Sequence, residues 1–196
     1  MGFAIADEAV RRGAEVTVVA ANVELPRIDA VTYVDVETAA ELLEATRAVF
    51  AAADVLVMSA AVADFRPASP VADKISKSGM EGMKLELEPT DDVLADLAGE
   101  RRPNQVVVGF AAEHGAEGVD RARGKLERKR LDAVVVNDIS RSDIGFDSDE
   151  NEVTIVTVAG SESVPRASKA EVAGRILDTL ERLRAERARA GQGQRA

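Results

Sequence analysis

The chain has 196 residues with a formal net charge of −10, and 46% of the residues are hydrophobic. It contains no cysteine and one histidine, which excludes disulfides, thiolate nucleophiles and metal sites built from cysteine or from several histidines. The negative charge argues against nucleic acid as a partner. No apolar run reaches the roughly 20 residues of a membrane span. The lack of cysteine fits a protein of the cytoplasm.

Helices and strands alternate along the chain. Apolar spacing predicts helices over residues 2–12, 39–52, 91–98, 115–130 and 169–190. Strands are predicted over residues 15–20, 31–36, 55–58, 83–88, 105–111, 131–136 and 152–158. Gly13 is the expected stop of the first helix, and Thr38, Thr90 and Ser168 are the expected caps of later helices.

This order predicts an α/β fold, namely a Rossmann-like three-layer αβα domain over residues 1–190 with a mostly parallel sheet and a disordered tail over 191–196. A doubly wound sheet normally begins with a central strand, whereas this chain begins with a helix. We therefore expect the sheet to lack its first strand and the loop after it. The strand over 152–158 is expected to be an edge strand or antiparallel.

Small residues follow the apolar strand at 55–58. Ala60 and Ala61 come shortly after it, and Asp64 and Arg66 follow them. Ligands of open α/β sheets bind just past the carboxyl ends of the strands, and small side chains let a flat or phosphorylated ligand approach the backbone. The alternative is a tight turn in which Asp64 and Arg66 are simply solvated, and this segment alone does not decide between the two.

Aromatic and polar residues end two further strands. Phe110 follows Gly109 at one strand end, where it could stack on a base or belong to the core. Asn137 and Asp138 end the next strand. No G-x-x-x-x-G-K-[ST] phosphate loop and no G-x-G-x-x-G fingerprint is present.

Lysines occur in two places that suit phosphate binding. Lys74 and Lys77 lie in a loop that could close over phosphates or be solvated. Lys125 and Lys129 lie one turn apart on a predicted helix, where they could clamp a phosphate or form a solvated face.

A set of short segments, read in order, resembles the phosphopantothenate–cysteine ligase family of bacterial coenzyme A synthesis. The resemblance covers nearly the whole chain up to the last helix. The segments are AAVADFRP, KISK, TDDVL, VGFAAE, KLERK, VVNDIS and GFDSDEN. The resemblance implies that the carboxylate of 4′-phosphopantothenate attacks the α-phosphate of CTP and that the L-cysteine amine then displaces CMP. It also implies Mg²⁺, a homodimer whose interface includes extra antiparallel strands such as 152–158, and FMN only where a decarboxylase half is present elsewhere.

The resemblance places the family's nucleotide-binding residues on Asp64, Lys74, Asp91, Asp92, Val93, Leu94, Phe110, Lys125 and Lys129. It implies that Lys74, on a flexible flap near the reacting phosphate, is catalytic. Ala60 and Ala61 would leave room for the base and ribose, and Asn137 and Asp138 would line the same pocket. No metal ligand is assigned.

Two departures from the family matter. The family's Gly-rich first loop and an Asn-Ser-Gly-Lys segment would precede Met1, and Ser76 stands in KISK where lysine is common. We therefore expect this chain to be an impaired or inactive ligase. The competing hypotheses are a nicotinamide-dependent reductase, for whose ribose Asn22 and Asp35 are poor ligands, and a non-catalytic nucleotide-binding or dimerisation module. No residue that would distinguish CTP from ATP is identified.

Overall fold

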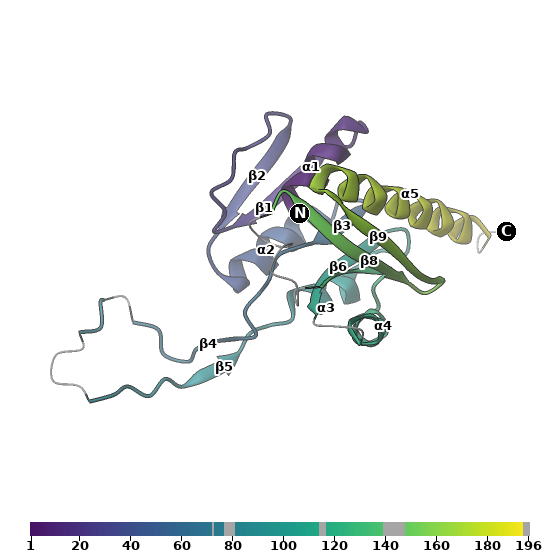
Figure 1. Ribbon diagram of the computed structural model, residues 1–196. Coiled ribbons are helices and arrows are strands. Elements are labelled where there is room, and N and C mark those ends of the chain that lie inside the picture. The colour runs from purple at the N-terminus through teal and green to yellow at the C-terminus, as the bar shows by residue number, and fades with distance from the viewer. Residues whose placement is uncertain (72, 77–80, 114–116, 139–147, 194–196) are drawn as a thin grey trace.

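The computed structural model describes residues 1–71, 73–76, 81–113, 117–138 and 148–193 (Figure 1). The elements follow in the order α1 (Gly2–Arg11), β1 (Val16–Ala21), β2 (Val31–Val36), α2 (Ala39–Phe50), β3 (Val55–Met58), β4 (Phe65–Pro67), β5 (Leu87–Pro89), α3 (Val93–Glu100), β6 (Val106–Glu113), α4 (Gly118–Arg128), β7 (Ala133–Asp138), β8 (Glu150–Thr157), β9 (Gly160–Ser168) and α5 (Lys169–Gly193). None of these helices is both long enough and apolar enough to cross a membrane.

Two groups of helices cover opposite faces of the sheet, which confirms the predicted three-layer αβα fold (Figure 1). α1 and α5 pack on one face, where Ile5 and Ile176 join Val106 and Val108 in one cluster of buried residues. α2, α3 and α4 pack on the other face, where Val107 belongs to a second cluster. The alternation along β6 therefore divides one strand between two cores, because successive side chains of a strand point to opposite faces.

The main sheet has the strand order β3-β6-β7-β8-β9. The pairs β3–β6 and β6–β7 are parallel, and the pairs β7–β8 and β8–β9 are antiparallel. Val106, Val107 and Val108 of β6 are at most 1% exposed, as expected for a central strand covered on both faces. β6 is therefore the strand around which the other elements are arranged.

The parallel part of the sheet is interrupted between β1 and β3. β1 pairs with β2 in a separate two-stranded sheet, and among the described residues β1 and β3 each have one edge without a ladder partner. Residues Val16–Val19 and Val55–Val57 are only half-buried, although both strands are mostly apolar. The predicted burial of β3 on both faces is therefore incomplete, and that the sheet lacks its first strand stays a prediction.

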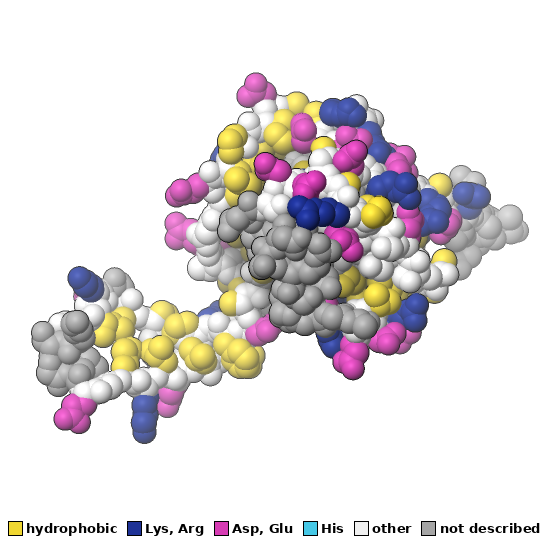
Figure 2. Space-filling view, in the orientation of Figure 1, with side chains coloured by type: hydrophobic (Ala, Val, Ile, Leu, Met, Phe, Trp, Pro, Cys, Tyr) yellow, Lys and Arg dark blue, Asp and Glu magenta, His cyan; other side chains and the backbone are white. Residues whose placement is uncertain are grey.

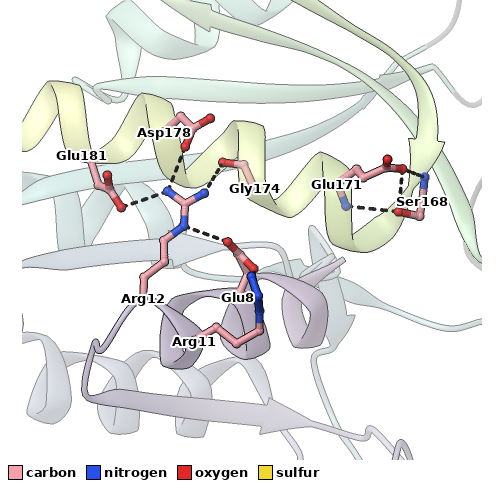
Figure 3. A network of polar contacts seen from close by, with 8 residues as sticks. All are labelled: Glu8, Arg11, Arg12, Ser168, Glu171, Gly174, Asp178 and Glu181. Carbon is pink, nitrogen blue, oxygen red and sulfur yellow. Dashed lines mark hydrogen bonds and ion pairs between the residues drawn. The ribbon is translucent and has the colours of Figure 1, made fainter.

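Arg12 ties α1 to α5 across one face of the sheet (Figure 3). Its guanidinium group lies 2.9 Å from carboxylate oxygens of both Asp178 and Glu181 and donates to the carbonyl oxygen of Gly174 at 3.1 Å. A further bond of 2.8 Å to Glu8 fixes the guanidinium from the α1 side. This network holds α1 on α5.

β4 and β5 form the root of a long arm that extends away from the body of the molecule (Figure 1). The predicted strand over residues 83–88 is wrong over most of its length, because only Leu87–Pro89 is a strand. The alternation of Met83, Leu85 and Leu87 has no core to face, and all three side chains are more than half exposed. The sequence alternates apolar and polar residues as a strand does, but the apolar side chains are not buried.

Helix caps and the antiparallel strands refine the prediction further. Thr38 and Ser168 cap α2 and α5 as predicted, whereas Asp92 caps α3 in place of Thr90. The hydroxyl of Thr90 instead donates to the carbonyl oxygen of Ala63 at the root of the arm. β8 is antiparallel as expected, but it is not an edge strand, because the unpredicted β9 pairs with it.

The remaining differences lie at element ends. Gly13 ends the first helix with a φ of +83°, as predicted. The last helix continues three residues beyond its predicted end, to Gly193. Residues 194–196 of the predicted tail lie outside the described residues, as do residues 139–147.

Asp132 is a buried carboxylate that joins three elements. Its Oδ2 atom accepts hydrogen bonds from Arg101 at 2.5 Å and from the backbone amide of Val107 at 2.8 Å. Its Oδ1 atom accepts two bonds from Arg187 of α5, at 2.8 and 2.6 Å. Asp132 is only 9% exposed, so its charge depends on these partners for compensation.

The substitution Asp132→Asn should lower the free energy of unfolding by about 3 kcal/mol, because it leaves two arginines partly buried without their counter-charge. The matched control is Asp54→Asn, since Asp54 pairs with Arg184 of the same helix but has a half-exposed side chain. The control should cost less than about 1 kcal/mol. Equal losses for both variants in urea unfolding would contradict the role given to Asp132.

Candidate functional site

The candidate site lies at the carboxyl edge of the parallel strands. Met58, the last residue of β3, pairs with Gly109, and Phe110 pairs with Val135 of β7. Ala60 and Ala61 follow β3 and are exposed. Because β3, β6 and β7 are parallel, their carboxyl ends meet at one edge, where α/β folds bind ligands.

Gly109 determines where α3 lies relative to this edge. A Cβ atom at Gly109 would lie 2.5 Å from Cδ2 of Leu94 and 3.3 Å from Cδ1 of Leu131, so any larger residue would force the Leu94 side chain to move. Val93 and Leu94 are 2% and 6% exposed. Their side chains therefore belong to the core, and only their backbone could meet a nucleotide as the family resemblance implied.

Two lysines turn toward the same edge, one in the last turn of α4 and one directly after it. Nζ of Lys125 donates to the carbonyl oxygen of Phe110 at 2.7 Å. Nζ of Lys129 lies 2.6 Å from Oδ2 and 2.8 Å from Oδ1 of Asp92, while Oδ1 also accepts the backbone amide of Ala95 at 3.1 Å. The structure thus brings together Asp92, Phe110, Lys125 and Lys129, which we call the lysine cluster.

Burial and charge shift the pKa values of two members of the lysine cluster. Burial lowers the pKa of Lys125, and the neighbouring charge of Lys129 lowers it further. Burial alone would raise the pKa of Asp92, but hydrogen bonds from Lys129 and the Ala95 amide, together with the charges of Lys129 and Lys125, outweigh it and lower that pKa. An anion bound at the cluster would therefore stabilise the charged forms of its two lysines.

Asn137 and Asp138 end β7 at this edge, whereas β6 continues past Phe110 to Glu113, two residues beyond its predicted end. The half-buried side chain of Phe110 packs against the core formed with α1 and α5, so its packing agrees with the core interpretation, and base stacking stays a prediction. The side-chain oxygen of Asn137 accepts a bond of 3.3 Å from Asn151, a contact between β7 and β8. The side chain of Asp138 lies outside the described residues.

The structure does not bring Lys74 to the lysine cluster. Lys74 is exposed on the arm between β4 and β5, which extends away from the body (Figure 1). Asp64 is exposed at the root of the arm, where its carbonyl oxygen accepts the amide of Thr90 at 3.0 Å. Asp91 is also exposed, just before the cap of α3, and the second flap lysine, Lys77, lies outside the described residues.

Two hollows lie away from the lysine cluster. One of about 380 Å³ is at the carboxyl ends of β1 and β2 and includes Asn22 and Asp35. The other, of about 170 Å³, lies between the β8–β9 turn and α5. Neither hollow includes a residue of the lysine cluster, which carries the positive charge that a phosphate needs. Within the described ranges, no three acidic or histidine side chains gather as metal ligands.

Two contacts at this edge were not predicted from the sequence. A Cβ atom at Gly2 would lie 2.5 Å from Oγ of Ser59, which shows how closely the start of α1 approaches the end of β3. Arg121 of α4 pairs with Glu113 at the end of β6, at 2.6 Å. The glycines at positions 2 and 109 were visible in the sequence, but no local pattern indicates the distant side chain that each accommodates.

The fold and this edge define a Rossmann-like α/β domain with a cationic site at the ends of its parallel strands. The family model described as DNA/pantothenate metabolism flavoprotein C-terminal domain matches residues 1–183, and the chain belongs to this family.

Curated relatives and a solved structure agree with this assignment. The coenzyme A biosynthesis bifunctional protein CoaBC of Bacillus subtilis is 38% identical over 183 residues, which are 92% of this chain and 44% of that protein. A cysteine/cysteine sulfinic acid decarboxylase of an unknown prokaryotic organism is 38% identical over 90% of this chain and 49% of its own. The chain spans about half the length of these curated relatives. A crystal structure of the C-terminal domain of a CoaBC protein is 33% identical, covers 94% of this chain and 82% of its own, and has a TM-score of 0.77.

Lys125 should make the stability of the protein depend on alkaline pH. Because its pKa is lowered in the folded state, the folded protein releases this proton at a lower pH than the unfolded chain, and the cost of the buried charge disappears as pH rises toward the ordinary value of 10.5. The free energy of unfolding of the wild type should therefore rise relative to that of Lys125→Arg as pH increases through this window. Urea unfolding at several pH values measures the difference, and a constant difference would contradict the prediction.

Proposed function

We propose that this chain catalyses the ligation of 4′-phosphopantothenate to L-cysteine, with CTP as the activating nucleotide. The observation that carries the proposal is the pair Lys125 and Lys129 at the strand-end edge of a member of this family. The 33% identity to the C-terminal domain of a CoaBC protein, a coenzyme A biosynthesis protein, supports it. A solved Cab2 mutant in complex with phosphopantothenate-cysteine shares the fold, with a TM-score of 0.74 at 15% identity.

The chemistry has two steps. A carboxylate oxygen of phosphopantothenate attacks the α-phosphorus of CTP, so that a phosphorus–oxygen bond breaks and pyrophosphate leaves. The cysteine amine then attacks the acyl carbon, loses a proton and expels CMP, which leaves the amide. In both steps negative charge is redistributed over phosphate oxygens, and fixed cations stabilise that charge.

The lysine cluster supplies those cations. Lys129 is held by Asp92 and Lys125 by a carbonyl oxygen, so each can exchange its present partner for a phosphate oxygen. The backbone at the start of α3 offers the positive end of a helix dipole nearby. Mg²⁺ would enter on the triphosphate, which supplies the oxygen ligands that this ion prefers.

The arm supports the proposal that the chain works as a homodimer. A row of apolar side chains on the arm is at least half exposed, and Figure 2 shows apolar side chains gathered along one of its faces. The row consists of Phe65, Val71, Ile75, Met83, Leu85 and Leu87. An exposed apolar face of this kind marks an interaction surface. We assign it to the second copy and assign Lys74, on the same arm, to the catalytic role that the family resemblance implies.

The reductase hypothesis has no comparable support. A nicotinamide cofactor needs a free acidic side chain at the end of the second strand of the fold for its ribose. Asp35 is instead paired with Arg27 at 2.5 Å, and the side-chain amide of Asn22 donates to the carbonyl oxygen of Glu37 at 3.1 Å. Both candidate residues therefore already have structural partners.

Calorimetry with CTP, ATP and NADPH in the presence of Mg²⁺ tests the proposal. CTP should bind most tightly, and Lys129→Met should weaken CTP binding at least about tenfold, because a hydrogen bond to a charged group contributes about 1.5–3 kcal/mol. The matched control is Arg123→Met, which removes an exposed cation from the opposite side of α4 and should leave the affinity unchanged.

The outcomes separate the three hypotheses. Tighter binding of NADPH would contradict the ligase in favour of the reductase. Another outcome is that CTP binds without any release of pyrophosphate when both phosphopantothenate and cysteine are present. That result would contradict the ligase and favour a non-catalytic nucleotide-binding module. Equal effects of the two substitutions on CTP affinity would contradict the assignment of the nucleotide to the lysine cluster.

A further inference from the structure

The smaller of the two hollows lies at the opposite edge of the sheet from the lysine cluster. Its volume is about 170 Å³, and it lies between the β8–β9 turn and α5. Thr157 at this turn pairs with Ala133, the first residue of β7, so the turn is at the amino edge of the parallel strands. The lysine cluster is at their carboxyl edge. A ligand in this hollow would therefore be separate from the nucleotide of the proposed function.

The floor of the hollow is buried, and the turn leaves it open. Ile155 of β8 and Thr179 of α5 are 2% and 4% exposed. The hydroxyl of Thr179 already donates to the carbonyl oxygen of Arg175 at 3.3 Å, within the same helix. Gly160 of the turn has a φ of +148°, which other residues rarely adopt, and a Cβ atom there would meet no neighbouring atom within 4 Å. The turn therefore keeps open space where a side chain would otherwise stand.

Arg182 supplies a positive charge at the rim of the hollow. Within the described part of the chain, its side chain makes no hydrogen bond or ion pair. The other charged residue that lines the hollow, Glu162, is bound to Arg175. Two arginines and one glutamate therefore leave one positive charge in excess beside the hollow.

The acidic residues of α5 do not neutralise Arg182. Asp178 and Glu181 both bind Arg12 of α1, at 2.9 Å in each case (Figure 3). Glu186, one turn after Arg182 and also a described residue, forms no ion pair with it. A guanidinium group in this state can hold both oxygens of a carboxylate through two parallel N–H···O bonds.

We propose that this hollow binds a small carboxylate with a short aliphatic tail. Arg182 holds the carboxylate group, and the tail lies on the apolar side chain of Ile155. The hollow has room for roughly five water molecules of about 30 Å³ each, so it is too small for a nucleotide or for phosphopantothenate. The apolar floor favours such a ligand over inorganic phosphate, because phosphate has no apolar surface to bury.

Butanoate is the probe for this site, and backbone amide chemical shifts of the full chain report where it binds. Changes that saturate should appear at residues 157–162 and 179–182, with a Kd on the order of millimolar for so small a ligand. Butan-1-ol and inorganic phosphate are the comparison ligands. Each should bind more weakly than butanoate, since the alcohol lacks the charge and phosphate lacks the tail.

Substitutions on α5 test the role of the guanidinium group. Arg182→Gln should weaken butanoate binding at least about tenfold, because charge-assisted hydrogen bonds are lost. Arg182→Lys should restore only part of the affinity, because lysine lacks the planar fork. The matched control is Arg189→Gln, which removes the same charge from the same helix. Arg189 bonds to the carbonyl oxygen of Ala185 and does not line the hollow, so the control should leave the affinity unchanged.

Three results would overturn the proposal. The first is the absence of saturable changes around the hollow in a protein that still unfolds cooperatively in urea. The second is phosphate binding as tight as that of butanoate, which would show attraction by charge alone. The third is equal weakening by the substitutions at positions 182 and 189. No nucleotide is present, so these results are independent of whether the chain binds CTP.

Discussion

The close packing of Leu94 on the bare backbone of Gly109 determines much of the site. It places α3 directly on the central strand, so that Asp92 begins the helix beside the carboxyl ends of the sheet. The same strand presents the carbonyl oxygen of Phe110 to Lys125. A methyl group at position 109 would force the Leu94 side chain to move, because interiors are packed without spare volume.

The charges of the lysine cluster are held in partnerships that a ligand can replace. Lys129 is paired with an aspartate that also caps α3, and Lys125 donates to the neutral carbonyl oxygen of Phe110. Burial makes the charged form of Lys125 costly, which a phosphate would offset. The cluster therefore holds two cations against one carboxylate, an arrangement suited to a ligand that brings several negative charges.

Local sequence patterns predicted the strands that are buried in the core and the starts of two helices. β6 and β7 were visible as apolar runs, and the capping residues Thr38 and Ser168 each have a glutamate three residues later that completes the cap. The lysine pair was also predictable, since two residues four apart lie on one helix face. What the sequence could not show was the partner of each lysine, because Asp92 and Phe110 are distant in the chain.

The predictions that were wrong or missing also depended on contacts between residues distant in the chain. The alternation over residues 83–88 resembles a strand with one buried face, but the arm offers nothing for that face to pack on. β9 includes Pro165 and alternates polar residues with few apolar ones, so its own sequence gives little strand signal, and its pairing with β8 determines its structure. The cap of α3 shifted from Thr90 to Asp92 because the threonine hydroxyl is bonded to the arm root.

The most direct test of the account is a map of backbone amide chemical shifts on addition of CTP and Mg²⁺. We expect the changes to concentrate at the end of β6, at the start of α3 and along α4 from Lys125 to Lys129. Changes confined to the ends of β1 and β2, where the hollow with Asn22 and Asp35 lies, would contradict the assignment of the nucleotide to the lysine cluster.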